Sequence, residues 1–89
     1  MSLKNIPDID KPREKLMSRG ASSLELEELI AAILGRGTVG YDAVKIGKMV
    51  GKVLMTYTYE TTIRDLLEIP GMGEAKACQI LASLELARR

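Results

Sequence analysis

The residues best suited to chemistry in this 89-residue sequence lie in the run Pro70-Gly71-Met72-Gly73-Glu74-Ala75-Lys76. Proline followed by two glycines predicts a tight turn, and both glycines are expected to supply backbone angles that other residues resist. The backbone amides near Gly73 then begin a helix, so they point outward without partners inside it. Such amides, aided by the helix dipole, are suited to holding a phosphate group. The candidate phosphate-binding residues are Gly71, Met72, Gly73, Glu74, Ala75 and Lys76.

Charges beside this turn act in opposite directions. Lys76 lies in the first turn of the predicted helix and can add a positive charge to the same phosphate, whereas the Glu74 carboxylate repels it. None of these groups would read a base, so any binding of DNA would be independent of sequence. The alternative interpretation is a compact helical corner used for packing or for protein contacts.

Three lysines form a second candidate feature. Lys45, Lys48 and Lys52 are spaced i, i+3 and i+7, which places them on one side of a predicted helix. Arg36 and Gly37 lie in the glycine-rich turn that precedes this helix. The lysines either form an ordinary solvated face or extend the phosphate-binding surface. The secondary DNA-contact candidates are Arg36, Gly37, Lys45, Lys48 and Lys52.

The overall composition limits what the chain is expected to do. Thirteen Lys and Arg against twelve Asp and Glu give a formal net charge of +1, so DNA binding must depend on the local placement of charge. There is no histidine and one cysteine, Cys78, which is expected to be a small buried side chain. We therefore expect no metal site, no cofactor and no catalytic activity in this chain. No apolar run approaches the ~18 residues that span a membrane, and a cytoplasmic location is expected.

The same composition favours a small all-α bundle. Hydrophobic residues make up 46% of the chain but aromatic residues only 3%, so the core must be aliphatic, which suits packed helices. Residues 1–9 lack periodicity and are predicted to form a flexible N-terminal tail. Residues 10–89 are predicted to form a single helical domain with a helix-hairpin-helix element at 61–87.

Capping signals and hydrophobic spacing predict about five helices. They are expected at about residues 12–18, from Ser22 or Ser23 to Gly35, from Asp42 to about Met55, from Thr61 or Thr62 to Leu67, and from Glu74 to about Ala87. Residues 57–60 are expected to be a connector. The buried faces are predicted at Leu26, Leu29, Ile30, Ile33 and Leu34, at Ile46, Met49, Val50, Val53 and Leu54, and at Ala77, Ile80, Leu81, Leu84 and Ala87.

Two further patterns bear on how the helices pack. Gly47 and Gly51 lie inside a predicted helix, which suggests that another backbone approaches there.

The stretch from Leu29 to Gly37 weakly parallels that from Leu66 to Gly73, at a spacing of 36 residues between the final glycines. We therefore expect a pseudo-two-fold pair of hairpins that would place two phosphate contacts along one duplex.

The hairpin resembles the helix-hairpin-helix motif of DNA-binding and repair proteins, which implies that Met72 anchors the turn in the core. The chain as a whole is similar to the amino-terminal region of the RadC family. The residues that carry this resemblance are Asp10-Lys11-Pro12-Arg13-Glu14-Lys15-Leu16, Arg19-Gly20-Ala21, Glu28-Leu29-Ile30-Ala31-Ala32-Ile33-Leu34-Gly35, and Leu67 through Ala77. Glu74 is part of the resemblance.

The RadC resemblance implies a role in DNA repair and a downstream metallopeptidase-like domain of the JAB/MPN type. This chain has no histidine from which to build the zinc site of such a domain. We therefore expect a non-catalytic, weak and sequence-independent DNA-binding module that tethers the downstream domain. The alternative is a protein-interaction or dimerisation module attached to that domain, for example as a homodimer.

Overall fold

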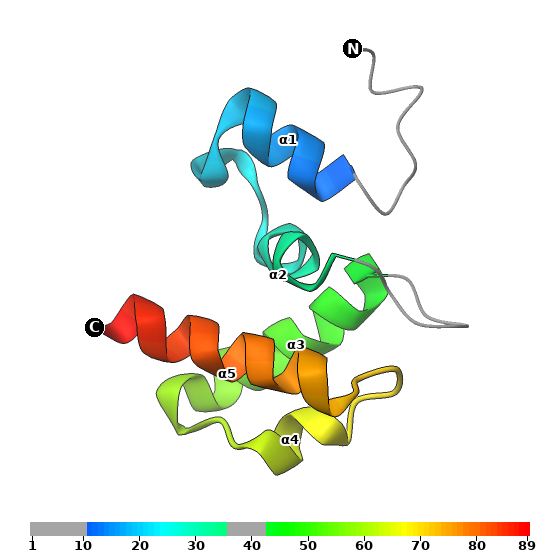
Figure 1. Ribbon diagram of the computed structural model, residues 1–89, viewed down its shortest axis with the longest axis vertical. Helices are drawn as coiled ribbons and strands as arrows, with labels where there is room; N and C mark the ends of the chain where they lie inside the picture. The colour runs from blue at the N-terminus through cyan, green and yellow to red at the C-terminus, as the bar shows by residue number, and fades with distance from the viewer. Residues whose placement is uncertain (1–10, 36–42) are drawn as a thin grey trace.

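The computed structural model describes residues 11–35 and 43–89 (Figure 1). Within these residues the chain forms five α-helices and two short 3-10 turns, and no strand. In chain order they are α1 (Lys11–Arg19), η3 (Ala21–Ser23), α2 (Leu26–Leu34), α3 (Ala43–Tyr57), η4 (Thr58–Glu60), α4 (Ile63–Leu67) and α5 (Glu74–Arg88). The predicted all-α fold class is therefore confirmed.

One aliphatic core joins α2, α3, α4, α5 and the turn between the last two helices. Its buried members are Ile30, Leu34, Ile46, Val50, Leu66, Ile69, Met72, Ala77 and Ile80. Ile46, Val50 and Leu66 are completely enclosed, at 0% exposure. Burying an aliphatic side chain of this size contributes about 1.5–3 kcal/mol, so this cluster is the main source of stability.

Helices α2 and α3 share the most extensive helix–helix contact among the described residues. A Cβ atom added at Gly47 would lie 2.5 Å from the carbonyl oxygen of Glu27, which belongs to α2. At Gly51 the added Cβ would lie 3.3 Å from Cδ2 of Leu26, the end of a side chain that can move. The predicted close approach of another backbone is thus confirmed at Gly47, while Gly51 faces a side chain.

Helix α1 lies apart from the main bundle and packs chiefly on α2 and η3 (Figure 1). Only Pro12 of this helix is buried. Arg13 Nε donates to the Ala32 carbonyl oxygen at 2.9 Å, and Lys15 Nζ pairs with Glu28 Oε1 at 3.0 Å. Polar contacts therefore account for much of the attachment of α1.

Glu28 links this attachment to the start of α2. Its Oε1 accepts a hydrogen bond from the Glu25 amide at 2.9 Å, in addition to the contact from Lys15. The Glu25 amide, and then the Lys15 ammonium, hold the pKa of Glu28 below its usual value of 4.5. Both partners favour the charged carboxylate.

Several predicted helix boundaries are confirmed and two need correction. Helix α1 matches the expected 12–18 within one residue at each end, and α2 ends at Leu34 before Gly35. The expected cap at Ser22 or Ser23 is wrong, because both serines lie in η3 and Glu25 occupies the N-cap of α2. The predicted connector at 57–60 is helical, since Tyr57 ends α3 and the next three residues form η4. The expected cap at Asp42 lies outside the described residues.

Some predicted burial is also wrong. Cys78 is exposed, because it follows Ala77 by one residue and so points about 100° away from the core face of α5. Ala87 is exposed near the end of α5. Leu26 and Ile33 retain 39% and 38% exposure, so the buried face of α2 is narrower than its hydrophobic pattern suggests.

The contact at Gly47 predicts different effects for two identical substitutions in α3. Gly47→Ala is expected to destabilise the fold by roughly 1–3 kcal/mol, because its methyl group meets a backbone oxygen that cannot turn aside. Gly51→Ala is expected to be neutral or stabilising, because the Leu26 side chain can move and alanine favours a helix. Urea unfolding of both variants measures the difference. Equal free energies of unfolding for the two variants would contradict the proposed backbone contact.

The lowered pKa of Glu28 predicts a pH-dependent contribution to stability. A carboxylate with a depressed folded-state pKa stabilises the fold above its usual pKa of 4.5. This contribution is lost as the pH falls below 4.5 through the lowered value. Urea unfolding at pH 7 and at about pH 3 should therefore show a smaller loss of stability on acidification for Glu28→Gln than for the unmodified chain. An equal effect of Glu60→Gln, which removes the same charge from exposed η4, would contradict this cause.

Candidate nucleic-acid interface

The hairpin begins with α4, a five-residue helix that depends on its cap. The Thr62 amide donates to Asp65 Oδ2 at 2.9 Å, and the Asp65 amide donates to Thr62 Oγ1 at 3.2 Å. This reciprocal capping box satisfies two amides that have no partner within so short a helix. The predicted start at Thr61 or Thr62 and the predicted end at Leu67 are both confirmed.

A tight turn follows α4 and is anchored in the core. The Met72 amide donates to the Ile69 carbonyl oxygen at 3.0 Å, and Gly71 has a φ of +85°. Proline at the second position and a positive φ at the third match a type II turn, which strongly favours glycine at Gly71. Met72 is only 7% exposed and belongs to the core cluster, as the resemblance to a helix-hairpin-helix motif implied.

Two details of the predicted phosphate site need correction. Gly73 has φ −93° and ψ 175°, an extended conformation open to any residue, so its backbone angle does not require glycine. A Cβ at Gly73 would meet nothing within 4 Å. The Met72 amide already serves the turn, so it is not available for a phosphate. The remaining candidate hydrogen-bond donors to a phosphate are therefore the amides at the start of α5.

The start of α5 presents its first amides at the protein surface. Gly73 is the N-cap and makes no side-chain cap hydrogen bond, and the first helical bond runs from the Ala77 amide to the Gly73 carbonyl oxygen at 3.0 Å. Gly73, Glu74 and Ala75 are exposed, whereas Lys76 is half-buried. The structure therefore brings the predicted residues 73–76 together at one helix terminus, where the helix dipole favours an anion. The Glu74 carboxylate lies within the same turn.

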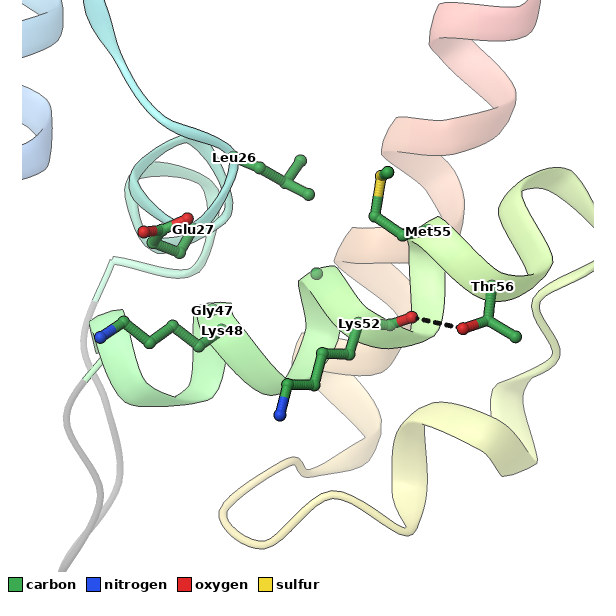
Figure 2. A pocket seen from close by; sticks show the side chains of 8 residues that line it. Leu26, Glu27, Gly47, Lys48, Lys52, Met55 and Thr56 are labelled. Atoms are coloured by element: carbon green, nitrogen blue, oxygen red, sulfur yellow. Dashed lines mark hydrogen bonds between the residues drawn. The ribbon is translucent and has the colours of Figure 1, made fainter.

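The three predicted lysines are all exposed on α3. Ile46 and Val50, on the opposite part of the same helix, are buried in the core. In the close view of this helix, Lys48 and Lys52 leave α3 on the same side (Figure 2). The predicted lysine stripe is therefore a solvent-facing edge. Arg36 and Gly37, the other secondary candidates, lie outside the described residues.

A groove between α2 and α3 was not predicted from the sequence. It has a volume of about 640 Å³ and is lined by Leu26, Glu27, Gly47, Lys48, Gly51, Lys52, Met55 and Thr56 (Figure 2). Met55 is 76% exposed on one of its walls. The two helix glycines were the only sequence signal for this feature, because they allow α2 to approach α3.

The two long helices of the proposed repeat have the same length but not the proposed spacing. Helices α3 and α5 both contain 15 residues, and both bury a face in the common core. Their first residues, Ala43 and Glu74, are 31 positions apart (74 minus 43), whereas the proposed repeat spacing was 36. A constant-spacing repeat therefore does not extend through both long helices. The first turn itself lies outside the described residues, so its predicted geometry remains a prediction.

The described residues contain no cluster of three His, Cys, Asp or Glu side chains that would suit a metal ion. Among the same residues, no helix combines the length and the apolar character needed to cross a membrane.

These features define a small all-α domain with a capped short helix, a type II turn and a glycine-capped long helix. The chain belongs to the UPF0758 family, whose N-terminal domain matches residues 3–78. This is the amino-terminal region of the RadC family that the sequence resembles, so the resemblance is confirmed.

Proteins of this family from several organisms match all or nearly all of the chain. A UPF0758 protein of Alkaliphilus oremlandii is 41% identical over 95 residues, covering 100% of this chain and 40% of the relative. One from Methanospirillum hungatei is 44% identical, with the same coverage of both chains, and one from Aquifex aeolicus is 39% identical, covering 98% of this chain and 38% of the relative. The chain thus spans about two fifths of the length of these relatives. No solved structure matches it significantly.

The geometry of the turn predicts different costs at its two glycines. Gly71→Ala is expected to destabilise the fold by about 1–2 kcal/mol, because alanine resists a positive φ. Gly73→Ala is expected to cost less than about 1 kcal/mol, the usual effect of alanine at an N-cap. Thermal or urea unfolding of the two variants tests this order. A larger cost at Gly73 would show that the turn is not built as described.

Proposed function

We propose that this chain is a non-catalytic DNA-binding module that holds the phosphate backbone without reading sequence. The observation that carries the proposal is the start of α5, where Gly73 caps the helix without a side chain and Glu74 and Ala75 are exposed. The amides of this first turn point along the helix axis, where a phosphate oxygen can accept their hydrogen bonds. Met72 supports this arrangement, because its burial holds the preceding turn rigidly against the core.

The lysine edge of α3 supplies the positive charge that the hairpin lacks. Lys45, Lys48 and Lys52 are exposed along about two turns of the helix. Each lysine that approaches a phosphate releases a counterion, which contributes to affinity irrespective of the base sequence. The lysine edge therefore complements the hairpin amides in the proposed interface.

Glu74 limits the strength of this interaction. Its carboxylate is exposed in the first turn of α5, where it interacts favourably with the helix dipole but repels a phosphate at the same position. With a net charge of +1, the chain has little long-range attraction for DNA. The proposed binding is therefore weak, which suits an accessory module.

In the whole protein we propose that this module tethers the remaining three fifths of the chain to DNA. The relatives extend well beyond the region matched here. The RadC resemblance implies that this remainder includes a JAB/MPN metallopeptidase-like domain and that the protein acts in DNA repair. Weak binding by the module would raise the local concentration of that domain near DNA.

Salt dependence of binding to a fluorescent duplex tests the lysine contribution. If the three lysines each neutralise one phosphate, affinity should fall about 40-fold between about 50 and 200 mM salt. The double variant Lys48→Ala/Lys52→Ala should reduce the slope of log affinity against log salt by about 1.8. Arg88→Ala/Arg89→Ala, at the far end of α5, removes the same charge and is the matched control. Equal effects of the two double variants would refute a specific lysine edge.

Glu74 provides a test of the hairpin in the same assay. Glu74→Gln should tighten duplex binding by roughly threefold to fivefold, because it removes one negative charge close to the proposed phosphate. Glu60→Gln changes net charge equally on η4, away from the hairpin, and should have a smaller effect. Undetectable DNA binding, or no difference between these two variants, would exclude the hairpin as the phosphate site.

A further inference from the structure

The groove between α2 and α3 has a shape that suits an inserted side chain. Gly47 and Gly51 contribute no side chains to its lining, while Leu26 and Met55 line it from α2 and α3. In Figure 2 the side chains of Leu26 and Met55 extend into the space between the two helices. The groove is an open surface hollow of about 640 Å³ and not an enclosed cavity, so an occupant would reach it directly from solvent.

The lining of this groove leaves apolar surface in contact with solvent. Leu26 is 39% exposed and Met55 is 76% exposed. Covering such surface stabilises a complex by about 25 cal/mol per Å² before the costs of association. The unbranched, polarisable side chain of Met55 can also adapt its shape to a ligand, as methionines do on peptide-binding surfaces.

Charge along the groove indicates what kind of segment it accepts. Lys48 and Lys52 line it one helical turn apart, and both are exposed. Glu27 is the one acidic residue in the lining, and in Figure 2 its carboxylate points away from the space between Leu26 and Met55. The Thr56 hydroxyl donates to the Lys52 carbonyl oxygen at 2.8 Å, so its proton is already used. With two lysines and one glutamate, the lining of the groove carries a net positive charge.

We propose that this groove binds an acidic amphipathic helix from a protein partner. An aliphatic side chain of that helix lies in the space between Leu26 and Met55. Carboxylates one turn apart on the partner pair with Lys48 and Lys52. DNA fits this site less well, because a phosphate backbone pairs with the lysines but leaves Leu26 and Met55 uncovered. The two ligands would share both lysines, so peptide and DNA would compete.

Nuclear magnetic resonance of the isotopically labelled 89-residue chain can test the groove with defined probes. The first probe is a synthetic helix of roughly 15 residues with leucines at i, i+3 and i+7 and glutamates elsewhere. The second replaces its glutamates with lysines, and the third replaces its leucines with serines. The first should shift the amide signals of Gly47 and Gly51 and the Met55 methyl signal. The other two should bind at least about tenfold more weakly.

A matched pair of variants distinguishes binding in the groove from non-specific binding elsewhere on the surface. Met55→Asp should weaken binding of the acidic probe about tenfold or more, because it places a negative charge on the groove wall. Leu86→Asp makes a similar change at a residue 79% exposed on α5, outside the groove, and should alter affinity less than twofold. Both positions are highly exposed, so neither substitution should unfold the chain.

Several results would overturn the proposal. One is equal binding of the acidic and basic probes, and another is equal effects of Met55→Asp and Leu86→Asp on affinity. A third is a concentration-dependent shift of the Gly47 and Gly51 signals without any probe. That result would assign the groove to self-association. A shift of the Met55 methyl signal by duplex DNA as large as that caused by the acidic probe would instead make the groove part of the nucleic-acid surface. The hairpin variants at Glu74 report on DNA binding separately, so the two proposals can fail independently.

Discussion

The contact between the Glu27 carbonyl oxygen and the backbone at Gly47 is the constraint on which the arrangement of this domain depends. It brings α2 so close to α3 that no side chain fits between them at this point. Helix α1 packs chiefly on α2 and η3, so the position of α1 follows from the same contact. The groove lies beside this contact, because both glycines are part of its lining.

Helix α3 serves three purposes on three sides. Ile46 and Val50 face the core that it shares with α4 and α5, the glycines face α2, and the lysines face solvent. A helix can carry three such edges because residues three, four and seven apart recur on the same side. The buried edge connects α3 to the hairpin through the core that includes Met72. The candidate phosphate site and the lysine edge are thus parts of one packed unit.

The proposed ligands of this unit are both negatively charged, and both would use Lys48 and Lys52. Because both ligands would need the same two side chains, the two interactions are mutually exclusive at Lys48 and Lys52. A partner carrying an acidic helix would then release the domain from DNA. Such competition needs no conformational change, because the two ligands would bind the same lysine side chains.

Local signals in the sequence were sufficient for the helices and for the turn. The capping box at Thr62 and Asp65, the Pro70-Gly71 pair and the hydrophobic spacing act within a few residues, so α4, the turn and α5 could be predicted. Tertiary packing decided what periodicity cannot show. It left Leu26 and Ile33 partly exposed and opened the groove beside Met55. A repeating pattern indicates which side of a helix is apolar, but only the neighbouring helices determine how much of that side is covered.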